Sequence, residues 1–228
     1  MHIPAWKRYL SYLVEIHLES ASSEYNPHLY VSMRRGRYQL STAHAVYSFE
    51  DLYTNFARAF EQCKLDELPG REALVLGLGL GSIPYILEKK QGMDFHITAV
   101  EIDEVVIDLA YRYTLADLQS PIDMVCTDAE IFVSSTYQKY DLICMDVFLD
   151  DQIPGPFQQI EFLEQLRELL TPGGLLLFNV LALRISDRRK AERFFSQVFK
   201  AVFPQATFVE VEFNWVLVND QTMLKTRQ

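Results

Sequence analysis

The stretch Val75-Leu76-Gly77-Leu78-Gly79-Leu80-Gly81-Ser82 decides the fold that the sequence predicts. An apolar run over 73–78 predicts a buried strand, and a helical pattern over 82–90 follows it. Glycines between the two let the backbone turn tightly and approach a ligand closely. Many nucleotide-binding folds have such a loop, although a tight strand-to-helix turn without a ligand has the same residues. We therefore expect three ligand-contacting glycines here: Gly77, Gly79 and Gly81.

Strands and helices alternate along the chain after this loop. Further strands are predicted over 97–102, 124–127, 141–145, 175–181, 207–213 and 215–219. Helices are predicted over 104–113 and 157–170, and from a capping Ser186 to about Val202. Apolar strands between helices indicate a parallel sheet covered on both faces. Because only Asn214 joins the last two strands, the last one should run antiparallel. We predict an α/β, Rossmann-like fold with seven strands, six parallel and one reversed.

Residues 1–47 have a different pattern, which predicts a small antiparallel β region. Between His28 and Ser41, two extended runs flank Arg34-Arg35-Gly36, which predicts a hairpin turn. A helix capped by Ser48 should follow. We therefore divide the chain into a β appendage over 1–47 and a Rossmann-like domain over 48–228.

Two acids follow neighbouring predicted strands. Glu101 ends the second strand, 20 residues after Gly81, where a carboxylate accepts both ribose hydroxyl protons. Asp128 directly follows the third strand, where its carboxylate accepts from the exocyclic amine of adenine and the N–H of Ala129 serves the ring nitrogen. The alternatives are a solvent-facing Glu101 and an Asp128 that caps the next helix. Because parallel strands end at one edge of a sheet, both acids should converge on one adenosine.

A third acid, Asp146, ends the fourth strand and is the candidate catalytic residue. Asp150 and Asp151 follow in the loop before Pro154. A carboxylate at this place faces the reactive end of the ligand, where it holds a cationic acceptor or takes a proton as the acceptor attacks. The alternative is an acid that only stabilises its loop.

Composition narrows the classes of partner. The net charge is −10, which disfavours a nucleic-acid substrate. No apolar run reaches the ~18 residues that span a bilayer, and the start at Met1 lacks the pattern of a secretory signal. We expect a cytoplasmic protein that does not bind membranes. The 3 cysteines and 5 histidines show no metal-ligand spacing, and Cys126 and Cys144 lie in apolar runs that predict buried thiols.

Together these residues resemble the class I S-adenosylmethionine-dependent methyltransferases and, within them, the spermidine synthase branch, the aminopropyltransferases. The resemblance covers roughly residues 37–183 and includes the glycine loop, Val100-Glu101-Ile102-Asp103, Asp128-Ala129 and Leu170-Thr171-Pro172-Gly173-Gly174. It implies S-adenosylmethionine or its decarboxylated form as cofactor. The residues that it implies for cofactor binding are Gly77, Gly79, Gly81, Glu101, Ile102, Asp128, Ala129 and Asp146.

The sequence departs from the family where the family binds a diamine. An acid between the glycines contacts the cofactor's amine in that family, and Leu80 stands at this position. A second acid follows three residues after the first in the family, where this chain has Leu149. A glutamine before the acidic pair becomes Ala45, and the family's Tyr-His pair falls near Thr54-Asn55, with Tyr53 one residue early. The nucleoside half of the site is retained and the polyamine half is changed.

Three functions fit these residues. We favour methyl transfer to a small acceptor, for which an amine is one candidate, because alignment of a nucleophile with an activated methyl group requires few side chains. The alternatives are aminopropyl transfer from decarboxylated S-adenosylmethionine to a diamine, and a non-catalytic module that binds adenosyl nucleosides. An NAD-dependent oxidoreductase is disfavoured because no second catalytic domain follows the sheet.

Oligomeric state is open at this point. Four residues give the N-terminal region an apolar face: Tyr30, Val31, Tyr38 and Leu40. This face either pairs two chains in a homodimer or packs within one chain.

Overall fold

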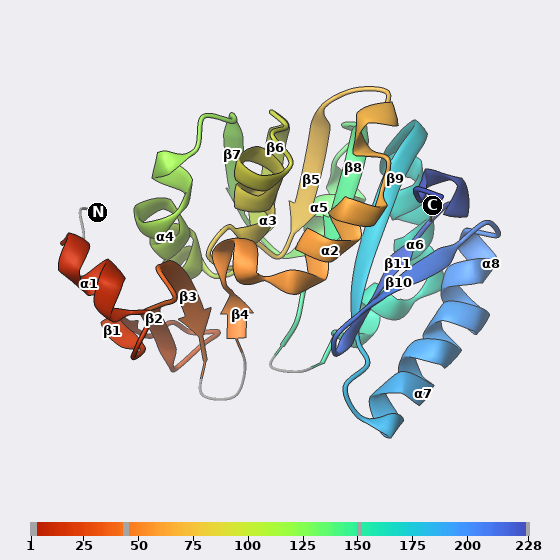
Figure 1. The fold of residues 1–228 in the computed structure, drawn as a ribbon. Helices are drawn as coiled ribbons and strands as arrows, with labels where there is room; N and C mark the ends of the chain where they lie inside the picture. The colour runs from red at the N-terminus through yellow and green to blue at the C-terminus, as the bar shows by residue number, and fades with distance from the viewer. Residues whose placement is uncertain (1–3, 43–45, 150–151, 227–228) are drawn as a thin grey trace.

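The computed structural model describes residues 4–42, 46–149 and 152–226, which form two β-sheets with helices around the larger one (Figure 1). The strands of the large sheet are β5 Glu72–Leu76, β6 His96–Glu101, β7 Ile122–Cys126, β8 Tyr140–Met145, β9 Leu170–Leu181, β10 Thr207–Val211 and β11 Asn214–Val218. The strands of the small sheet are β1 Ile16–Ala21, β2 Leu29–Arg34, β3 Arg37–Ser41 and β4 Val46–Ser48. The longer helices are α1 Ala5–Leu10, α2 Thr54–Gln62, α4 Glu104–Tyr113, α5 Ala129–Ser135, α6 Ile160–Leu169 and α7 Ile185–Arg193.

Short helical segments complete the chain. They are η1 Glu50–Leu52, η2 Leu65–Glu67, α3 Ser82–Tyr85, η3 Ile86–Lys90, η4 Leu115–Asp117, η5 Gly155–Gln158, η6 Phe194–Phe199, α8 Lys200–Val202 and η7 Gln221–Met223. η3 and η6 are π-helical continuations of α3 and α7. The predicted helices over 82–90 and 186–202 are therefore present as continuous helical stretches.

The large sheet has the order β10-β11-β9-β8-β5-β6-β7. Six strands are parallel, and β11, the last strand in the chain, lies antiparallel between β9 and β10. This confirms the predicted Rossmann-like sheet. β6 and β7 lie on one side of β5, and β8 and β9 lie on its other side, so the strand order reverses at β5. Ligands bind at such a reversal of strand order, at the carboxyl ends of the strands.

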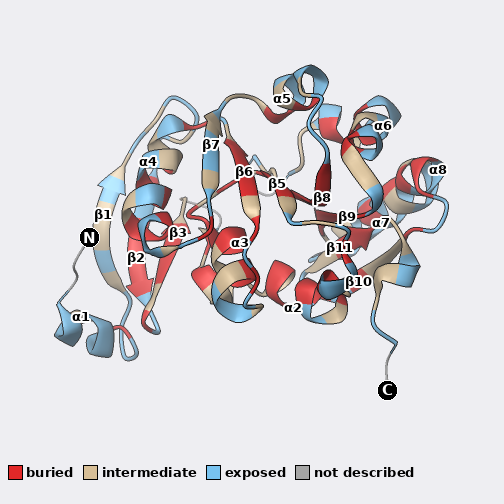
Figure 2. Ribbon diagram, turned by 90° about the horizontal axis from the view of Figure 1, so that it is seen from above, coloured by how far each residue is buried: buried red, intermediate tan, exposed pale blue. Residues whose placement is uncertain are grey.

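Helices cover both faces of the large sheet (Figure 2). One face packs on α2, α3 and α4, and the other on α5, α6, α7 and α8. The central strand β5 shows why: Ala73 and Val75 belong to the first core, and Leu74 and Leu76 to the second. Successive side chains of a strand point to opposite faces, and burying a Val or Leu contributes about 1.5–3 kcal/mol. An apolar residue at every position therefore requires cover on both sides.

The small sheet is an antiparallel meander in the order β1-β2-β3-β4. The predicted hairpin is confirmed, because Arg34 pairs with Arg37 across a turn in which Arg35 and Gly36 both have positive φ angles, 52° and 73°. β4 spans the division that we placed between residues 47 and 48, and it pairs with β3. The domain division stays a prediction.

The apolar face of the small sheet packs against α4. Val31, Tyr38 and Leu40 are buried in one cluster with Val106 and Leu109. Of the four residues considered for pairing between chains, Tyr30 is exposed and the other three are buried within the chain. The alternative of packing within one chain therefore accounts for this face, and a homodimer has no support from these residues.

Three local predictions are wrong. Ser48 does not cap a helix, because it ends β4 and its hydroxyl group lies 2.6 Å from that of Ser82; α2 begins at Thr54. Ser186 does not cap a helix either, because it lies inside α7, which begins at Ile185. The N–H of Arg184, just before α7, donates a hydrogen bond to the carboxylate of Asp187. Cys126 is exposed because β7 is an edge strand. Within the described ranges, no helix combines the length and the apolar character that crossing a bilayer requires.

Candidate active site

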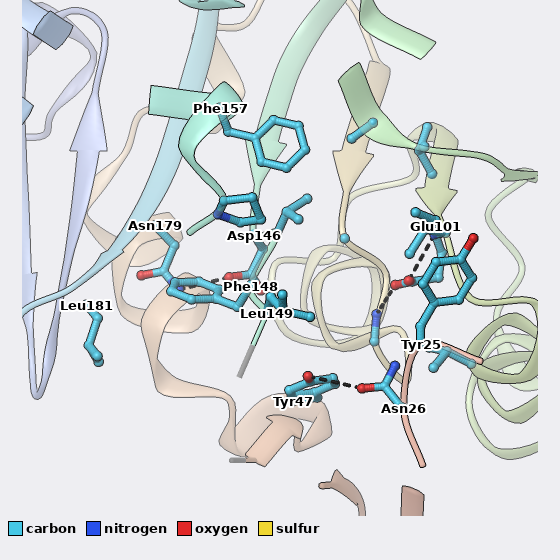
Figure 3. Close-up of a pocket in the computed structure, with 18 of the residues that line it drawn as sticks. Tyr25, Asn26, Tyr47, Glu101, Asp146, Phe148, Leu149, Phe157, Asn179 and Leu181 are labelled. Carbon is cyan, nitrogen blue, oxygen red and sulfur yellow. Dashed lines mark hydrogen bonds between the residues drawn. The ribbon is translucent and has the colours of Figure 1, made fainter. Parts of the chain in front are cut away.

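A cavity of about 590 Å³ lies at the carboxyl ends of the parallel strands. Figure 3 shows Glu101 and Tyr25 on one side of it and Asp146, Asn179 and Leu181 on the other. Seven of the eight predicted site residues line it: Gly77, Gly79, Glu101, Ile102, Asp128, Ala129 and Asp146. The crevice expected at the reversal of strand order is therefore present, and the three predicted acids share it.

Glycine is required in this loop for two different reasons. Gly77 has a φ of 87°, and a Cβ atom there would lie 2.5 Å from the carbonyl oxygen of Asp146. Because Gly77 has no Cβ atom, the ends of β5 and β8 can come together under the cavity. Gly81 also has a φ of 87°, but its Cβ would meet Leu115 at 2.5 Å, and Gly81 does not line the cavity. The structure therefore places Gly81 in the packing beneath the site.

The carboxylate of Glu101 ties the glycine loop to the end of β6. Oε2 accepts hydrogen bonds from the N–H groups of Leu78 at 3.1 Å and Gly79 at 3.4 Å. Oε1 accepts from Ile102 at 3.0 Å and Asp103 at 3.3 Å. Burial raises the pKa of Glu101, and the backbone hydrogen bonds oppose this. Each oxygen thus has one short and one long bond, and the long bonds are the ones that a ligand replaces most easily.

Asp128 caps α5, which is the structural role that the sequence also allowed. Its Oδ1 accepts from the N–H groups of Glu130 at 2.7 Å and Ile131 at 3.3 Å. No described residue donates a hydrogen bond to its Oδ2. The carboxylate therefore combines a fixed orientation with one oxygen that is open to a ligand in the cavity.

Asp146 is held from one side only. Asn179 Nδ2 donates to its Oδ1 at 2.8 Å, and the Tyr53 hydroxyl donates to the same atom at 3.1 Å. Burial raises the pKa of Asp146 from its usual 3.8 to about 7, against the lowering effect of these two hydrogen bonds. No described residue donates to Oδ2. A carboxyl group with this pKa, in a cavity, is typical of a functional site.

A chain of amides fixes the orientation of Asn179. Asn214 Nδ2 donates to Asn179 Oδ1 at 2.9 Å, which leaves the Nδ2 of Asn179 directed at Asp146. Asn55, from the start of α2, also lines the cavity. The resemblance pointed to Thr54-Asn55 and Tyr53, but sequence reasoning missed Asn179 and Asn214. The signal available for Asn179 was its place as a polar residue inside the apolar run 175–183.

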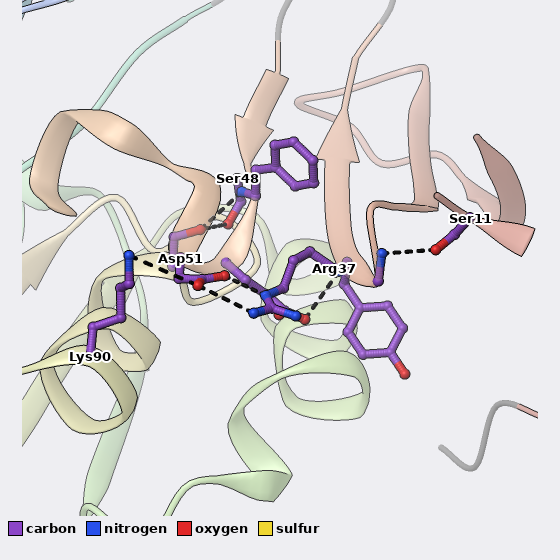
Figure 4. A network of polar contacts seen from close by, with 10 residues as sticks. Ser11, Arg37, Ser48, Asp51 and Lys90 are labelled. Carbon is purple, nitrogen blue, oxygen red and sulfur yellow. Dashed lines mark hydrogen bonds and ion pairs between the residues drawn. The ribbon is translucent and has the colours of Figure 1, made fainter. Parts of the chain in front are cut away.

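A network of charges holds the turn that carries Tyr53 (Figure 4). Arg37 of β3 binds the carboxylate of Asp51 with Nε and, at 3.3 Å, with Nη2. The buried Glu50 accepts from Tyr38 N at 3.0 Å and lies 3.5 Å from Arg37. Burial raises the pKa of Glu50 from 4.5 to about 7. The small sheet therefore fixes the segment that ends at Tyr53.

The N-terminal region also closes the cavity beside Glu101. Ser23 and Asn26 donate to Asp103 Oδ2 at 2.5 and 2.8 Å, and Tyr47 donates to Asn26 at 3.2 Å. These bonds hold the segment between β1 and β2 over the cavity, where Tyr25 lines the wall. Sequence reasoning gave no signal for this wall.

The residues at which this sequence differs from the spermidine synthase branch lie in different parts of the structure. Leu80 is 1% exposed and belongs to the core between the small sheet and α4, so it does not face the cavity. Leu149 is 61% exposed and lines the cavity. Ala45, Asp150 and Asp151 lie outside the described residues. No group of three or more His, Cys, Asp or Glu side chains that could hold a metal is found among the described residues.

Comparison with known families decides the relationship. Residues 60–222 match the model of the spermine/spermidine synthase domain, which covers well over half of the chain. The chain belongs to the spermine/spermidine synthase family. The resemblance stated from the motifs is thereby confirmed.

Curated relatives of this spermidine synthase family member include two kinds of transferase. A "Probable polyamine aminopropyl transferase" of Bifidobacterium longum is 36% identical over 109 residues, which are 47% of this chain and 24% of the relative. An "N-terminal histidine N-methyltransferase" of Emericella nidulans is 36% identical over 115 residues, 48% of this chain and 20% of the relative. The chain thus spans about a quarter or less of the length of these two relatives.

Solved structures share the fold. A probable spermidine synthase from Corynebacterium glutamicum has a TM-score of 0.70 and 20% identity, over 88% of this chain and 78% of that one. Human methyltransferase-like protein 13, in complex with SAH, has a TM-score of 0.60 and 23% identity, over 78% of this chain and 86% of that one. At these identities the likeness concerns the fold alone, and it agrees with the sheet described above.

Proposed function

We propose that this protein transfers an alkyl group from an adenosyl sulfonium to an amine nitrogen, and that the group is the aminopropyl group of decarboxylated S-adenosylmethionine. The observation that carries the proposal is the convergence of Glu101, Asp128 and Asp146 on one cavity. The family match and the aminopropyl transferase of Bifidobacterium longum support aminopropyl transfer. They favour it over the methyl transfer that the sequence alone led us to prefer.

The cavity fits the adenosine part of such a cofactor. Glu101 would accept the ribose hydroxyl groups in place of its two long bonds to Gly79 and Asp103. Asp128 would accept from the adenine amine with the oxygen that the helix cap leaves open. The N–H of Ala129 would serve the ring nitrogen, with Ile102 beside it in the wall. Gly77 and Gly79 let the backbone approach the ligand.

Asp146 is the candidate catalytic residue. The sulfonium supplies an activated carbon; the protein supplies orientation and a place for the proton. Tyr53 and Asn179 fix Oδ1, so Oδ2 is free to bind the ammonium group of the acceptor and to take its proton. Because the pKa of Asp146 is about 7, the carboxylate is both available as a base and able to hold a proton near neutral pH.

Methyl transfer from S-adenosylmethionine is the second candidate. It is favoured by Leu80, which occupies the position of the family's amine-binding acid and is buried in the core. The amine of a decarboxylated cofactor would then lack that carboxylate. The N-terminal histidine N-methyltransferase of Emericella nidulans supports this candidate. The cytoplasmic location and the absence of nucleic-acid partners stay predictions.

Titration calorimetry with the two thioether products separates these functions. Tighter binding of 5′-methylthioadenosine than of S-adenosylhomocysteine is expected for aminopropyl transfer, and the reverse order for methyl transfer. Turnover with a panel of amines, followed by mass spectrometry, should be lost in Asp146→Asn while nucleoside binding persists. Nucleoside binding without turnover of any amine in the wild-type protein would instead favour a non-catalytic module.

A further inference from the structure

The N-terminal helix α1 carries its apolar side chains on the outside of the molecule. Trp6, Tyr9, Leu10 and Leu13 are exposed, with Trp6 at 61%, Tyr9 at 76% and Leu13 at 83%. Helical hydrogen bonds continue past the end of α1, since the N–H of Leu13 donates to the carbonyl oxygen of Leu10 at 2.9 Å. The spacing i, i+3, i+4 and i+7 places these four side chains on one side of the helix. We refer to them as the outer stripe.

The other side of this helix is polar and is attached to the small sheet. Ser11 is buried; its hydroxyl oxygen accepts a hydrogen bond from the N–H of Gly36 at 2.8 Å (Figure 4), and its carbonyl oxygen accepts one from the N–H of Arg35 at 2.8 Å. A Cβ atom at Gly36 would lie 2.9 Å from the hydroxyl oxygen of Tyr12, so the Tyr12 ring packs closely on this turn. A surface helix usually turns its apolar side to the core. Here the contacts of Ser11 hold the apolar side toward solvent, at an outer corner of the molecule (Figure 2).

Positive charge surrounds the outer stripe. Lys7 and Arg8 belong to α1, and Arg34 and Arg35 belong to the hairpin that Ser11 holds. We refer to these four residues as the basic rim. Within the described ranges, no ion pair joins any of them to an acid. The segments 1–14 and 27–37 contain no Asp or Glu, although the net charge of the chain is −10. The basic rim is therefore a local concentration of positive charge in an acidic protein.

We propose that the outer stripe and the basic rim bind the surface of a membrane that contains anionic lipids, with α1 lying in the plane of that surface. Trp and Tyr side chains favour the boundary between the headgroups and the acyl chains. Lys and Arg side chains reach the headgroups while their aliphatic stems stay beside the apolar part. The basic rim is complementary to the negative charge of these headgroups. The inference goes beyond the proposed function, because none of these residues lines the cavity.

Charge also decides between a membrane and a second copy of this chain. A two-fold contact centred on the outer stripe would place the basic rims of the two copies against each other, which is unfavourable. From the sequence we expected no membrane contact, because no apolar run is long enough to span a bilayer. A helix that lies on a membrane needs only an apolar side with cations beside it.

Co-sedimentation of the full chain with lipid vesicles tests the proposal. The protein should bind vesicles made of equal parts of phosphatidylcholine and phosphatidylglycerol, bind weakly to phosphatidylcholine alone, and dissociate as NaCl screens the charges. Leu13→Ser should reduce the partition to the mixed vesicles about tenfold, and Arg8→Gln or Arg34→Gln about fivefold each. The matched controls are Ile131→Ser and Arg189→Gln, which change an exposed apolar residue of α5 and an exposed cation of α7.

Several outcomes would overturn the proposal. They are the absence of binding to the mixed vesicles, equal binding to phosphatidylcholine alone, and losses in the control variants as large as those in the stripe and rim variants. Because Leu13 is 83% exposed, Leu13→Ser should keep the melting temperature; if it does not, Trp6→Ser takes its place. Sedimentation velocity without lipid tests the second occupant: a wild-type dimer that this substitution dissociates would assign the outer stripe to a second copy of the chain and overturn the membrane proposal.

Discussion

The hydroxyl group of Tyr53 donates a hydrogen bond to Oδ1 of Asp146 over 3.1 Å, across 93 positions of sequence. Tyr53 follows the turn that Arg37 holds, and Asp146 follows β8. The N-terminal sheet therefore positions a donor on the carboxylate at the end of a central strand. Because Asn179 binds the same oxygen, Oδ2 of Asp146 is left without a donor among the described residues.

The Tyr53 contact should be visible in the pH dependence of turnover. Tyr53→Phe removes a hydrogen bond that lowers the pKa of Asp146, so this pKa should rise above about 7. A hydrogen bond to a charged group contributes about 1.5 kcal/mol, which corresponds to a rise of about one pH unit. The acid limb of the kcat profile should move upward by that amount. Tyr137→Phe, at an exposed position, is the control; an acid limb that stays in place would contradict the assignment.

Glu50 should make the folded state less stable as the pH rises. Its pKa is raised from 4.5 to about 7, so between these values the folded protein holds a proton that the unfolded chain has released. Stability therefore falls as the pH rises through this window, by on the order of 3 kcal/mol for this group. Glu50→Gln should show a flatter dependence of unfolding free energy on pH between 4.5 and 7.5 in urea titrations. Asp146 titrates in both proteins, so the difference isolates Glu50; parallel curves would refute the effect.

Asp128 allows its two roles to be separated. Asn is as good a helix cap as Asp, so Asp128→Asn should keep the melting temperature. Its free side-chain atom would become a donor rather than an acceptor, and affinity for an adenosyl nucleoside should fall by about 1–3 kcal/mol. Asp128→Ala should lose this affinity and also about 1 kcal/mol of stability. Unchanged nucleoside affinity in Asp128→Asn would leave Asp128 as a cap alone.

Gly81 and Gly92 form a matched pair for the packing beneath the loop. Both have positive φ angles, 87° and 66°, so alanine at either site should cost about 1–2 kcal/mol of backbone strain. A Cβ at Gly81 also meets Leu115 at 2.5 Å, whereas nothing lies within 4 Å at Gly92. Gly81→Ala should therefore destabilise the protein by about 1–3 kcal/mol more than Gly92→Ala in urea denaturation. Equal losses in the two variants would show that Leu115 moves aside.

The sequence by itself determined the elements whose signals are local. The unbroken apolar run of β5, the glycine loop and a short link between the last two strands predicted a covered parallel sheet with a reversed last strand. The link itself lies at Glu212 and Phe213, not at Asn214, which is the first residue of β11. The placement of Glu101, Asp128 and Asp146 directly after strands was enough to bring them to one cavity, because parallel strands share an edge.

Only the tertiary structure decided the contacts between distant segments. Nothing local distinguishes an asparagine that orients a carboxylate, such as Asn179, from a chance interruption of an apolar run, and nothing local directs Tyr53 to Asp146. For Leu80 the local signal is misleading. Its place in the glycine loop suggests contact with a cofactor, but its side chain is buried in the core beneath the small sheet. Such contacts depend on which surfaces meet when the sheets and helices pack. The periodicity of apolar residues along the chain does not predict which surfaces these are.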